Sequence, residues 1–224
     1  MITADRRKGV VIVAGGSGSR MGGDTPKQFI FINGTPVLMH TIKKFTQFDP
    51  SILVVVVLPE NQLDYWAQLC LQAHFSLPHQ IATGGPTRFH SVQNGLALTG
   101  SCDLIAIHDG VRPLVSTDTI ARTFDAAQQH GSAIPVLPSN ESLRVGTPEH
   151  SSAVDRTQYF LVQTPQVFRS ELLLESYRQP YDPAFTDDAS VVEKAGYRVQ
   201  MVTGNRENIK ITHPEDLQIA KLWL

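Results

Sequence analysis

The residues best suited to chemistry form a glycine-rich segment near the N-terminus, with two cations beside it. Residues 14–22 read AGGSGSRMG and include Arg20, and Lys27 follows shortly afterwards in the motif TPKQF. Such a turn lets backbone N–H groups point at phosphate oxygens. Two cations would stabilise the charge that collects on pyrophosphate when a triphosphate reacts at its α-phosphorus. The segment therefore predicts a polyphosphate-binding loop.

Two common phosphate-binding signatures do not fit this loop. A dinucleotide motif GxGxxG that starts at Gly16 needs a third glycine at position 21, where the chain has Met21. A P-loop needs the triplet Gly-Lys-Ser or Gly-Lys-Thr, which does not occur in the sequence. What remains is a glycine-rich loop that carries its own arginine, Arg20, with Lys27 a few residues later.

Asp109 is the candidate metal ligand. It follows the apolar run 103–108, and ligands bind at the carboxyl ends of strands in a parallel α/β sheet. A carboxylate there suits Mg²⁺, which takes one or two carboxylates together with phosphates and water. Asp109 could instead cap a helix or pair with Arg112, and these roles are compatible with metal binding.

Other polar residues carry weaker signals. Arg88 could bind a phosphate or hold its loop, and Asp187 is expected to cap a helix. Lys210 taken alone reads as a surface charge. The histidines show no HxxH or HxxxH spacing, so a zinc site is not expected.

The elements that must position these residues alternate along the chain. Expected strands cover 9–14, 52–58, 103–108, 133–137 and 200–203, and expected helices cover 35–45, 60–75, 88–98, 117–129 and 214–222. Continuous apolar runs are typical of strands buried on both faces. This order predicts an α/β fold with a doubly wound, mostly parallel Rossmann-like sheet.

The polar stretch 138–156 interrupts this rhythm. The segments 141–145 and 152–156 could pair as a hairpin around 146–150. We expect a projecting β-hairpin arm rather than a disordered loop. The prediction is one domain over 1–224, with 138–156 as a dimerisation arm of a homodimer.

Composition restricts the partners and the compartment. The net charge of −2 gives no basic field for nucleic acid or an anionic membrane, and no apolar stretch approaches the length of a membrane span. The two cysteines, Cys70 and Cys102, make no disulfide framework. We expect a cytoplasmic, soluble protein without nucleic-acid or membrane partners.

The ordered motifs of the chain resemble those of a known family. The segment AGGSGSRMGG…TPKQF is similar to the signature of the sugar-phosphate nucleotidyltransferases, and within them to the 2-C-methyl-D-erythritol 4-phosphate cytidylyltransferases. Further matching blocks follow in the family's order: GG…R…SV…NGL (84–96), HDGVRP (108–113), VDR (154–156), QTPQ (163–166), TDDAS (186–190) and NIKIT (208–212). The match covers about 9–217.

The resemblance implies an activity and roles for matching positions. It implies transfer of the cytidylyl group of CTP to a polyol phosphate, with Mg²⁺ as cofactor. The implied catalytic residues are Arg20, Lys27, Arg156 and Lys210. The implied nucleotide contacts are Ala14, Gly15, Gly16, Gly18, Gly85 and Ser91. The implied substrate contacts are Asp109, Arg112, Ser142, Thr164 and Thr186, and Asp109 is also the implied metal ligand.

Two departures and two rival functions accompany the resemblance. Pro86 replaces an acidic residue that the family often has, and Ser142 stands at an arm position that is usually threonine. The rivals are a ribitol-5-phosphate cytidylyltransferase and a non-catalytic nucleotide-binding module. If the arm reaches over a partner's site, Arg112, Ser142 and Arg156 could serve the neighbouring subunit.

Overall fold

The structure is a computed structural model that describes residues 7–16 and 25–224. The strands of its main sheet are β1 (Lys8–Val13), β4 (Leu53–Leu58), β5 (Gln80–Thr83), β6 (Leu104–Asp109), β7 (Ser132–Pro138), β10 (Phe160–Val162), β11 (Gln166–Arg169) and β12 (Gln200–Thr203). The α-helices are α1 (Val37–Phe48), α2 (Leu63–Gln72), α3 (Arg88–Leu96), α4 (Thr117–His130), α5 (Ser170–Ser176), α6 (Asp188–Lys194) and α7 (Pro214–Trp223).

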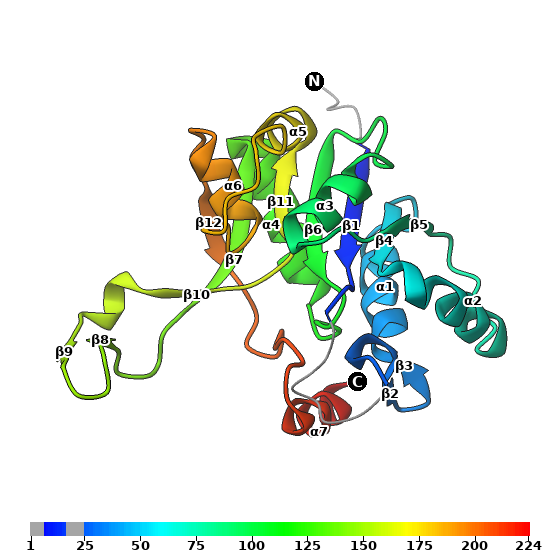
Figure 1. The fold of residues 1–224 in the computed structure, drawn as a ribbon, viewed down its shortest axis with the longest axis horizontal. Helices are drawn as coiled ribbons and strands as arrows, with labels where there is room; N and C mark the ends of the chain where they lie inside the picture. The colour runs from blue at the N-terminus through cyan, green and yellow to red at the C-terminus, as the bar shows by residue number, and fades with distance from the viewer. Residues whose placement is uncertain (1–6, 17–24) are drawn as a thin grey trace.

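An eight-stranded sheet forms the centre of the molecule (Figure 1). Its order is β10-β7-β11-β6-β1-β4-β5, and β12 also pairs with β7. The strands β6, β1, β4 and β5 pair in parallel. The strand β11 lies antiparallel between β6 and β7, and β10 is antiparallel to β7. The predicted α/β fold with a mostly parallel sheet is confirmed, and the antiparallel strands are an addition that the sequence did not predict.

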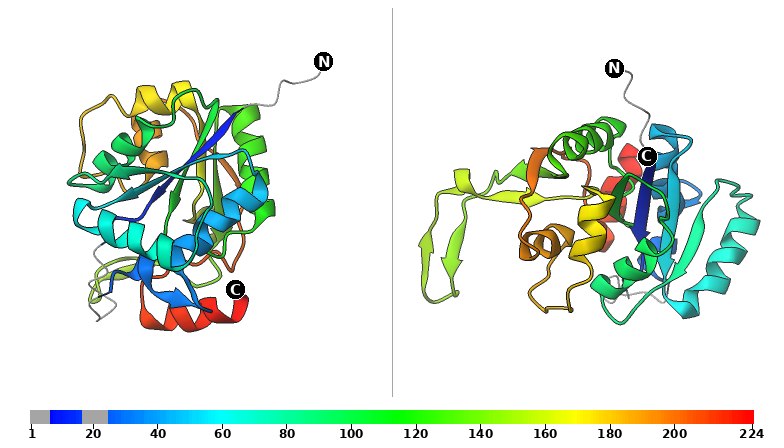
Figure 2. Two further views of the ribbon diagram at one scale, coloured as in Figure 1. Left: turned by 90° about the vertical axis from the view of Figure 1, so that its right-hand side faces the viewer. Right: turned by 90° about the horizontal axis from the view of Figure 1, so that it is seen from above.

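Helices cover both faces of the sheet, because alternate residues of each central strand point to opposite sides. Val10, Val54 and Val56 belong to the hydrophobic core beneath α1, α2 and α4. Val11 and Val55 belong to the opposite core, beneath α3, α5 and α6. Strands that are apolar on both faces are therefore what two helical layers require. Figure 2 shows the two layers on either side of the strands.

A smaller unit lies below the carboxyl ends of the strands. It consists of the two-stranded pair β2 (Phe31–Ile32) and β3 (Thr35–Pro36) with the helix α7. Ile32, Val37, Ile211 and Ala220 bury their side chains together there. This packing fixes the C-terminal segment against the loop that follows β6, since Ile211 donates its backbone N–H to the carbonyl of Val111.

The arm departs from the body as a two-stranded hairpin (Figures 1 and 2). Its strands are β8 (Arg144–Gly146) and β9 (Ser151–Ala153), which pair antiparallel. The predicted hairpin is thus present, and its strands are shorter than the segments 141–145 and 152–156. A short 3-10 helix, η4 (Arg156–Gln158), leads back to the sheet.

Most predicted element boundaries agree with the structure, but one predicted helix corresponds to two shorter elements. Over 60–75 the sequence predicts one helix, whereas the structure has a 3-10 turn, η3 (Glu60–Gln62), followed by α2. None of the helices formed by residues 7–16 and 25–224 has the length and hydrophobicity of a membrane-spanning segment.

Candidate active site

Two adjoining clefts open at the carboxyl ends of β1 and β6. They enclose about 310 Å³ and about 300 Å³. Arg88, Asp109 and Lys210 line both of them. The first cleft is also lined by Val13, Ala14, Gly15, Gly16, Lys27, Gln28, Gly85, Pro86, Thr87, Ser91 and Val111. The second is also lined by Arg112, Val162, Gln163, Thr164, Gln166, Thr186 and Asp187. Such a crevice is where open α/β sheets bind ligands.

Lys27 reaches the first cleft from the short 3-10 helix η2 (Lys27–Phe29). Its side chain is largely buried and lies against the loop, because a Cβ at Gly16 would be 3.3 Å from Lys27 Cε and 3.8 Å from Nζ. The ammonium group and the backbone at the end of β1 therefore face the same space. The predicted residues Gly18 and Arg20 lie outside the described residues.

Asp109, the last residue of β6, is buried among three cations. Its Oδ2 lies 3.1 Å from Arg112 Nε and 3.1 Å from Lys210 Nζ, and its Oδ1 lies 3.8 Å from Arg88 Nε. Burial alone would raise the pKa of Asp109, but Arg88, Lys210 and Arg112 outweigh it and hold that pKa below its usual range. Asp109 is therefore ionised, and it pairs with Arg112 as the sequence allowed.

Arg112 and Lys210 are placed by backbone contacts on either side of Asp109. Arg112 also donates from Nη1 to the carbonyl of Asn208, at 2.8 Å, and Lys210 precedes the buried Ile211. Arg112 thus lines the second cleft of its own chain. Lys210 is 42% exposed, so its ammonium group remains accessible from both clefts.

Arg88 is fixed by a partner that the sequence did not suggest. Its guanidinium donates to both carboxylate oxygens of Asp188, at 2.9 and 2.7 Å, and Asp188 also accepts a 2.6 Å hydrogen bond from the Tyr177 hydroxyl. Asp188 is fully buried. The adjacent Asp187 caps α6 as predicted, since its side chain accepts from Ser190 N–H. Arg88 therefore holds its loop while its exposed edge lines both clefts.

The loop before α3 shapes one wall of the first cleft. Ser91 Oγ accepts from the backbone N–H of Gly85 at 3.0 Å and donates to the carbonyl of Thr87 at 2.9 Å. The Ser91 hydroxyl thus stabilises the loop, although the residue lines the cleft. Pro86 lines the same cleft without a charge.

Thr164 and Thr186 both line the second cleft. Thr164 Oγ1 accepts from the backbone N–H of Asp109 at 3.1 Å and lies 3.0 Å from His108 Nδ1. Thr186 precedes α6, and its backbone N–H donates to Ser190 Oγ. These contacts connect the second cleft to both β6 and α6.

The two predicted residues of the arm lie elsewhere. Among the described residues that line the clefts, neither Ser142 nor Arg156 is found. Ser142 is exposed before β8, and Arg156 donates to the carbonyl of Asn140 at the base of the hairpin. The chain therefore does not bring these residues to its own site.

Comparisons with known proteins agree with this geometry. Residues 9–224 match the sequence family of 2-C-methyl-D-erythritol 4-phosphate cytidylyltransferase. Proteins of that name from Bacteroides thetaiotaomicron and Phocaeicola vulgatus are 53% and 55% identical to this chain, over 97% and 96% of it and 100% and 98% of their own lengths. The crystal structure of the one from Thermus thermophilus is 33% identical, with a TM-score of 0.79 over 96% of this chain and 98% of that one.

The chain belongs to the 2-C-methyl-D-erythritol 4-phosphate cytidylyltransferase family. It is thus an enzyme of the nucleotidyltransferase class. The first cleft brings the Lys27 side chain next to residues 14–16 at the end of β1. The second cleft adds hydroxyl and cationic groups next to it.

Some residues in or beside these clefts were not predicted. Gln28 is fully buried, lines the first cleft and donates to Gln62 at 2.7 Å. His108 is fully buried beneath Thr164, and Asn208 donates from Nδ2 to the carbonyl of Thr164 at 2.8 Å. Each of them lies within or beside a motif that carried the resemblance, which was the available signal.

Among the residues that the structure describes, the candidate metal ligand at this site is the carboxylate of Asp109. Within the described ranges, no group of three or more His, Cys, Asp or Glu side chains gathers to hold an ion. Asp109 presents one carboxylate whose Oδ2 is paired with Arg112 and Lys210, and whose Oδ1 lies 3.8 Å from Arg88 Nε. This fits a Mg²⁺ that takes its remaining ligands from phosphates and water.

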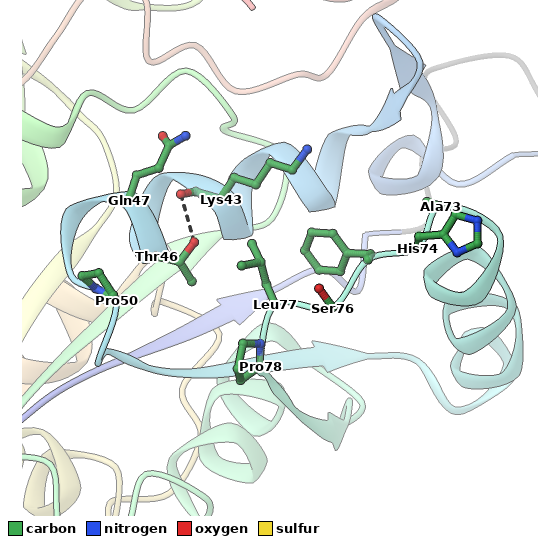
Figure 3. A pocket seen from close by; sticks show the side chains of 10 residues that line it. Lys43, Thr46, Gln47, Pro50, Ala73, His74, Ser76, Leu77 and Pro78 are labelled. Atoms are coloured by element: carbon green, nitrogen blue, oxygen red, sulfur yellow. Dashed lines mark hydrogen bonds between the residues drawn. The ribbon is translucent and has the colours of Figure 1, made fainter.

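Two larger hollows lie away from the predicted residues. One, of about 520 Å³, is formed by α1 and the segment 73–78 (Figure 3), and it contains Lys43 and His74. The other, of about 830 Å³, lies between α2 and the segment 74–81 and is largely apolar. Neither contains a residue from the motifs of the resemblance.

Proposed function

We propose that this chain transfers the cytidylyl group of CTP to 2-C-methyl-D-erythritol 4-phosphate in non-mevalonate isoprenoid biosynthesis. The products are 4-diphosphocytidyl-2-C-methyl-D-erythritol and pyrophosphate. The observation that carries the proposal is the wall of Arg88, Asp109 and Lys210 between the clefts. A nucleotide in the first cleft and a polyol phosphate in the second would meet there. The family match supports the identity of both substrates.

The reaction needs positioning and charge stabilisation rather than a covalent intermediate. A phosphate oxygen of the acceptor attacks the α-phosphorus of CTP in line. One P–O bond forms, the bond to the bridging oxygen of the β-phosphate breaks, and pyrophosphate leaves with that electron pair. The attacking phosphate is already anionic near neutral pH, so no general base is required. Arg20 and Lys27 stabilise the leaving group, while Lys210 and Arg156 hold the acceptor.

Mg²⁺ is part of the proposal as a cofactor. Asp109 would hold it together with phosphate oxygens, and the ion would supply positive charge to the phosphates. Removal of Mg²⁺ with a chelator should abolish pyrophosphate release, and added Mg²⁺ should restore it.

A homodimer accounts for the position of the arm. Ser142 and Arg156 flank the two strands of a hairpin that projects from the body (Figure 1). Each arm would therefore reach over the site of a partner in an isologous pair. We also propose a cytoplasmic location. The free thiols of Cys70 and Cys102 support it, because thiols stay reduced in the cytoplasm.

One assay tests the function. Pyrophosphate release is measured with CTP and either 2-C-methyl-D-erythritol 4-phosphate, ribitol 5-phosphate or common sugar phosphates. We expect turnover with the methylerythritol phosphate to exceed the others. Faster turnover of ribitol 5-phosphate would replace the proposed acceptor. If CTP binds but no acceptor releases pyrophosphate, the chain is a non-catalytic nucleotide-binding module.

A further inference from the structure

Thr164 lines the second cleft, and its hydroxyl contacts the end of β6. Its Oγ1 accepts a hydrogen bond from the backbone N–H of Asp109, at 3.1 Å. Its other close polar neighbour is Nδ1 of His108, at 3.0 Å. A hydroxyl has one proton and two lone pairs. The amide of Asp109 occupies one lone pair. The direction of the hydroxyl proton therefore decides whether Thr164 offers a ligand a hydrogen-bond donor or an acceptor.

The ring of His108 determines that direction. Its Nε2 lies 3.2 Å from the carbonyl oxygen of Arg112, which can only accept, so Nε2 carries a proton. The ring is fully buried and packs edge-on against Phe45, with ring centroids 4.9 Å apart.

The tautomer follows from burial and from these contacts. A ring without solvent contact is held neutral, because burial disfavours the charged form. The proton of His108 therefore lies on Nε2, and Nδ1 has a bare lone pair. The Thr164 hydroxyl must donate to that lone pair, because Nδ1 has no proton to offer.

We infer that His108 is a positioning residue that turns the Thr164 proton away from the second cleft, so that Thr164 presents only a lone pair to the acceptor substrate. A lone pair recognises a hydrogen-bond donor, such as a polyol hydroxyl, and repels an anionic phosphate oxygen. The carbonyl of Thr164 is already occupied by Asn208. The inference rests on the proposed function, since it assigns the hydroxyl end of the acceptor to Thr164 and its phosphate end to the cations.

Two substitutions of His108 separate its two contacts. In His108→Asn, the side-chain carbonyl can occupy the place of Nδ1 and still accept from Thr164. In His108→Gln, the longer amide can still donate to Arg112 but leaves Thr164 without its acceptor. We expect His108→Gln to raise the KM for the acceptor roughly tenfold, with the KM for CTP unchanged, and His108→Asn to recover most of this loss.

Acceptors that lack a single hydroxyl distinguish this role from a purely structural one. A purely structural role would leave their loss in kcat/KM unchanged between variants. In the unmodified enzyme, one such deoxy acceptor should lose several-fold in kcat/KM. In Thr164→Val and His108→Gln that same loss should disappear, while Thr164→Ser should keep it. The control His79→Gln makes the same exchange in a histidine paired with Trp66, away from both clefts. It should behave as the unmodified enzyme.

Ring-nitrogen NMR of the full chain tests the inference independently of activity. A spectrum with the proton of His108 on Nε2 supports it, whichever acceptor the enzyme proves to use. A proton on Nδ1, or equal KM increases for CTP and acceptor in folded His108→Gln, would overturn it. Failure of the unmodified enzyme to use methylerythritol phosphate would instead contradict the proposed function.

Discussion

Asp188 holds the guanidinium of Arg88 by two hydrogen bonds, although the two residues are 100 positions apart in the chain. Arg88 begins α3 and Asp188 begins α6, so this pair joins the starts of two helices on the same face of the sheet. It also sets the position of a side chain that lines both clefts. The geometry of the site thus depends on a buried carboxylate outside it.

Loss of this carboxylate should destabilise the protein. Asp188→Ala leaves Arg88 without its main partner, and breaking a buried pair costs about 3–5 kcal/mol. Asp187→Ala is the matched control, because it removes a helix cap worth about 1 kcal/mol. Urea unfolding of both variants measures the difference. Equal losses would show that the pair contributes no more than a cap.

Lys27→Ala should impair turnover without impairing folding. The ammonium group lies against Gly16 in the first cleft, and removal of one group that stabilises developing charge costs about 100- to 1,000-fold in kcat. Lys221→Ala, which changes an exposed lysine of α7, should have no effect. Steady-state pyrophosphate release checks both. Unchanged kcat in Lys27→Ala would remove its assigned role.

Gly85→Ala should disturb the first cleft. A Cβ at this position would lie 2.5 Å from His90 Cβ and 3.0 Å from the His90 carbonyl carbon, so the loop or the start of α3 must move. We expect about 1–3 kcal/mol of destabilisation and a higher KM for CTP. Gly84→Ala is the control, since its nearest contact would be 3.4 Å, to Ser91 Oγ. Similar KM values for the two variants would argue against the loop as a nucleotide contact.

Mixing two inactive variants should restore activity if the arm serves the partner. In a dimer of one Lys27→Ala and one Arg156→Ala subunit, one site would have both native residues. After subunit exchange in an equal mixture, we expect about a quarter of the unmodified activity. The separate variants are the controls. Absence of any recovery, with exchange shown by mass labelling, would place Arg156 in the site of its own chain.

The contact between Tyr177 and Asp188 should make stability sensitive to alkali. Burial, reinforced by Asp188, raises the pKa of Tyr177 well above its ordinary value of 10. Above about pH 10 the unfolded chain loses this proton and the folded chain keeps it, so stability falls as pH rises. The fall should be smaller in Tyr177→Phe. Urea unfolding near pH 9 and pH 11 measures it, and equal slopes would contradict the shift.

The parallel centre of the fold was predictable because burial on both faces leaves continuous apolar runs. The strands β1, β4 and β6 were found on this basis. The strand β10 was not, because all three of its residues are exposed and it has no buried face. The strand β11 is a four-residue segment between β6 and β7, and its pairing depends on contacts that are distant in sequence.

The same distinction holds at the site. Lys27 and Asp109 follow recognisable local patterns, and the structure places both in the first cleft. The pairing of Arg88 with Asp188 and the contact of His108 with Thr164 are set by tertiary packing. A helix-start aspartate reads locally as a cap, so sequence reasoning selected Asp187 and passed over its neighbour.

The wall common to the two clefts ties the occupancy of one to the affinity of the other. Arg88 and Lys210 are both within 4 Å of Asp109, so an anion on either side competes with that carboxylate for the same positive charge. Free energies of this kind are reciprocal, and each ligand must change the dissociation constant of the other by the same factor. Under the proposed function, these three side chains would couple the binding of donor and acceptor.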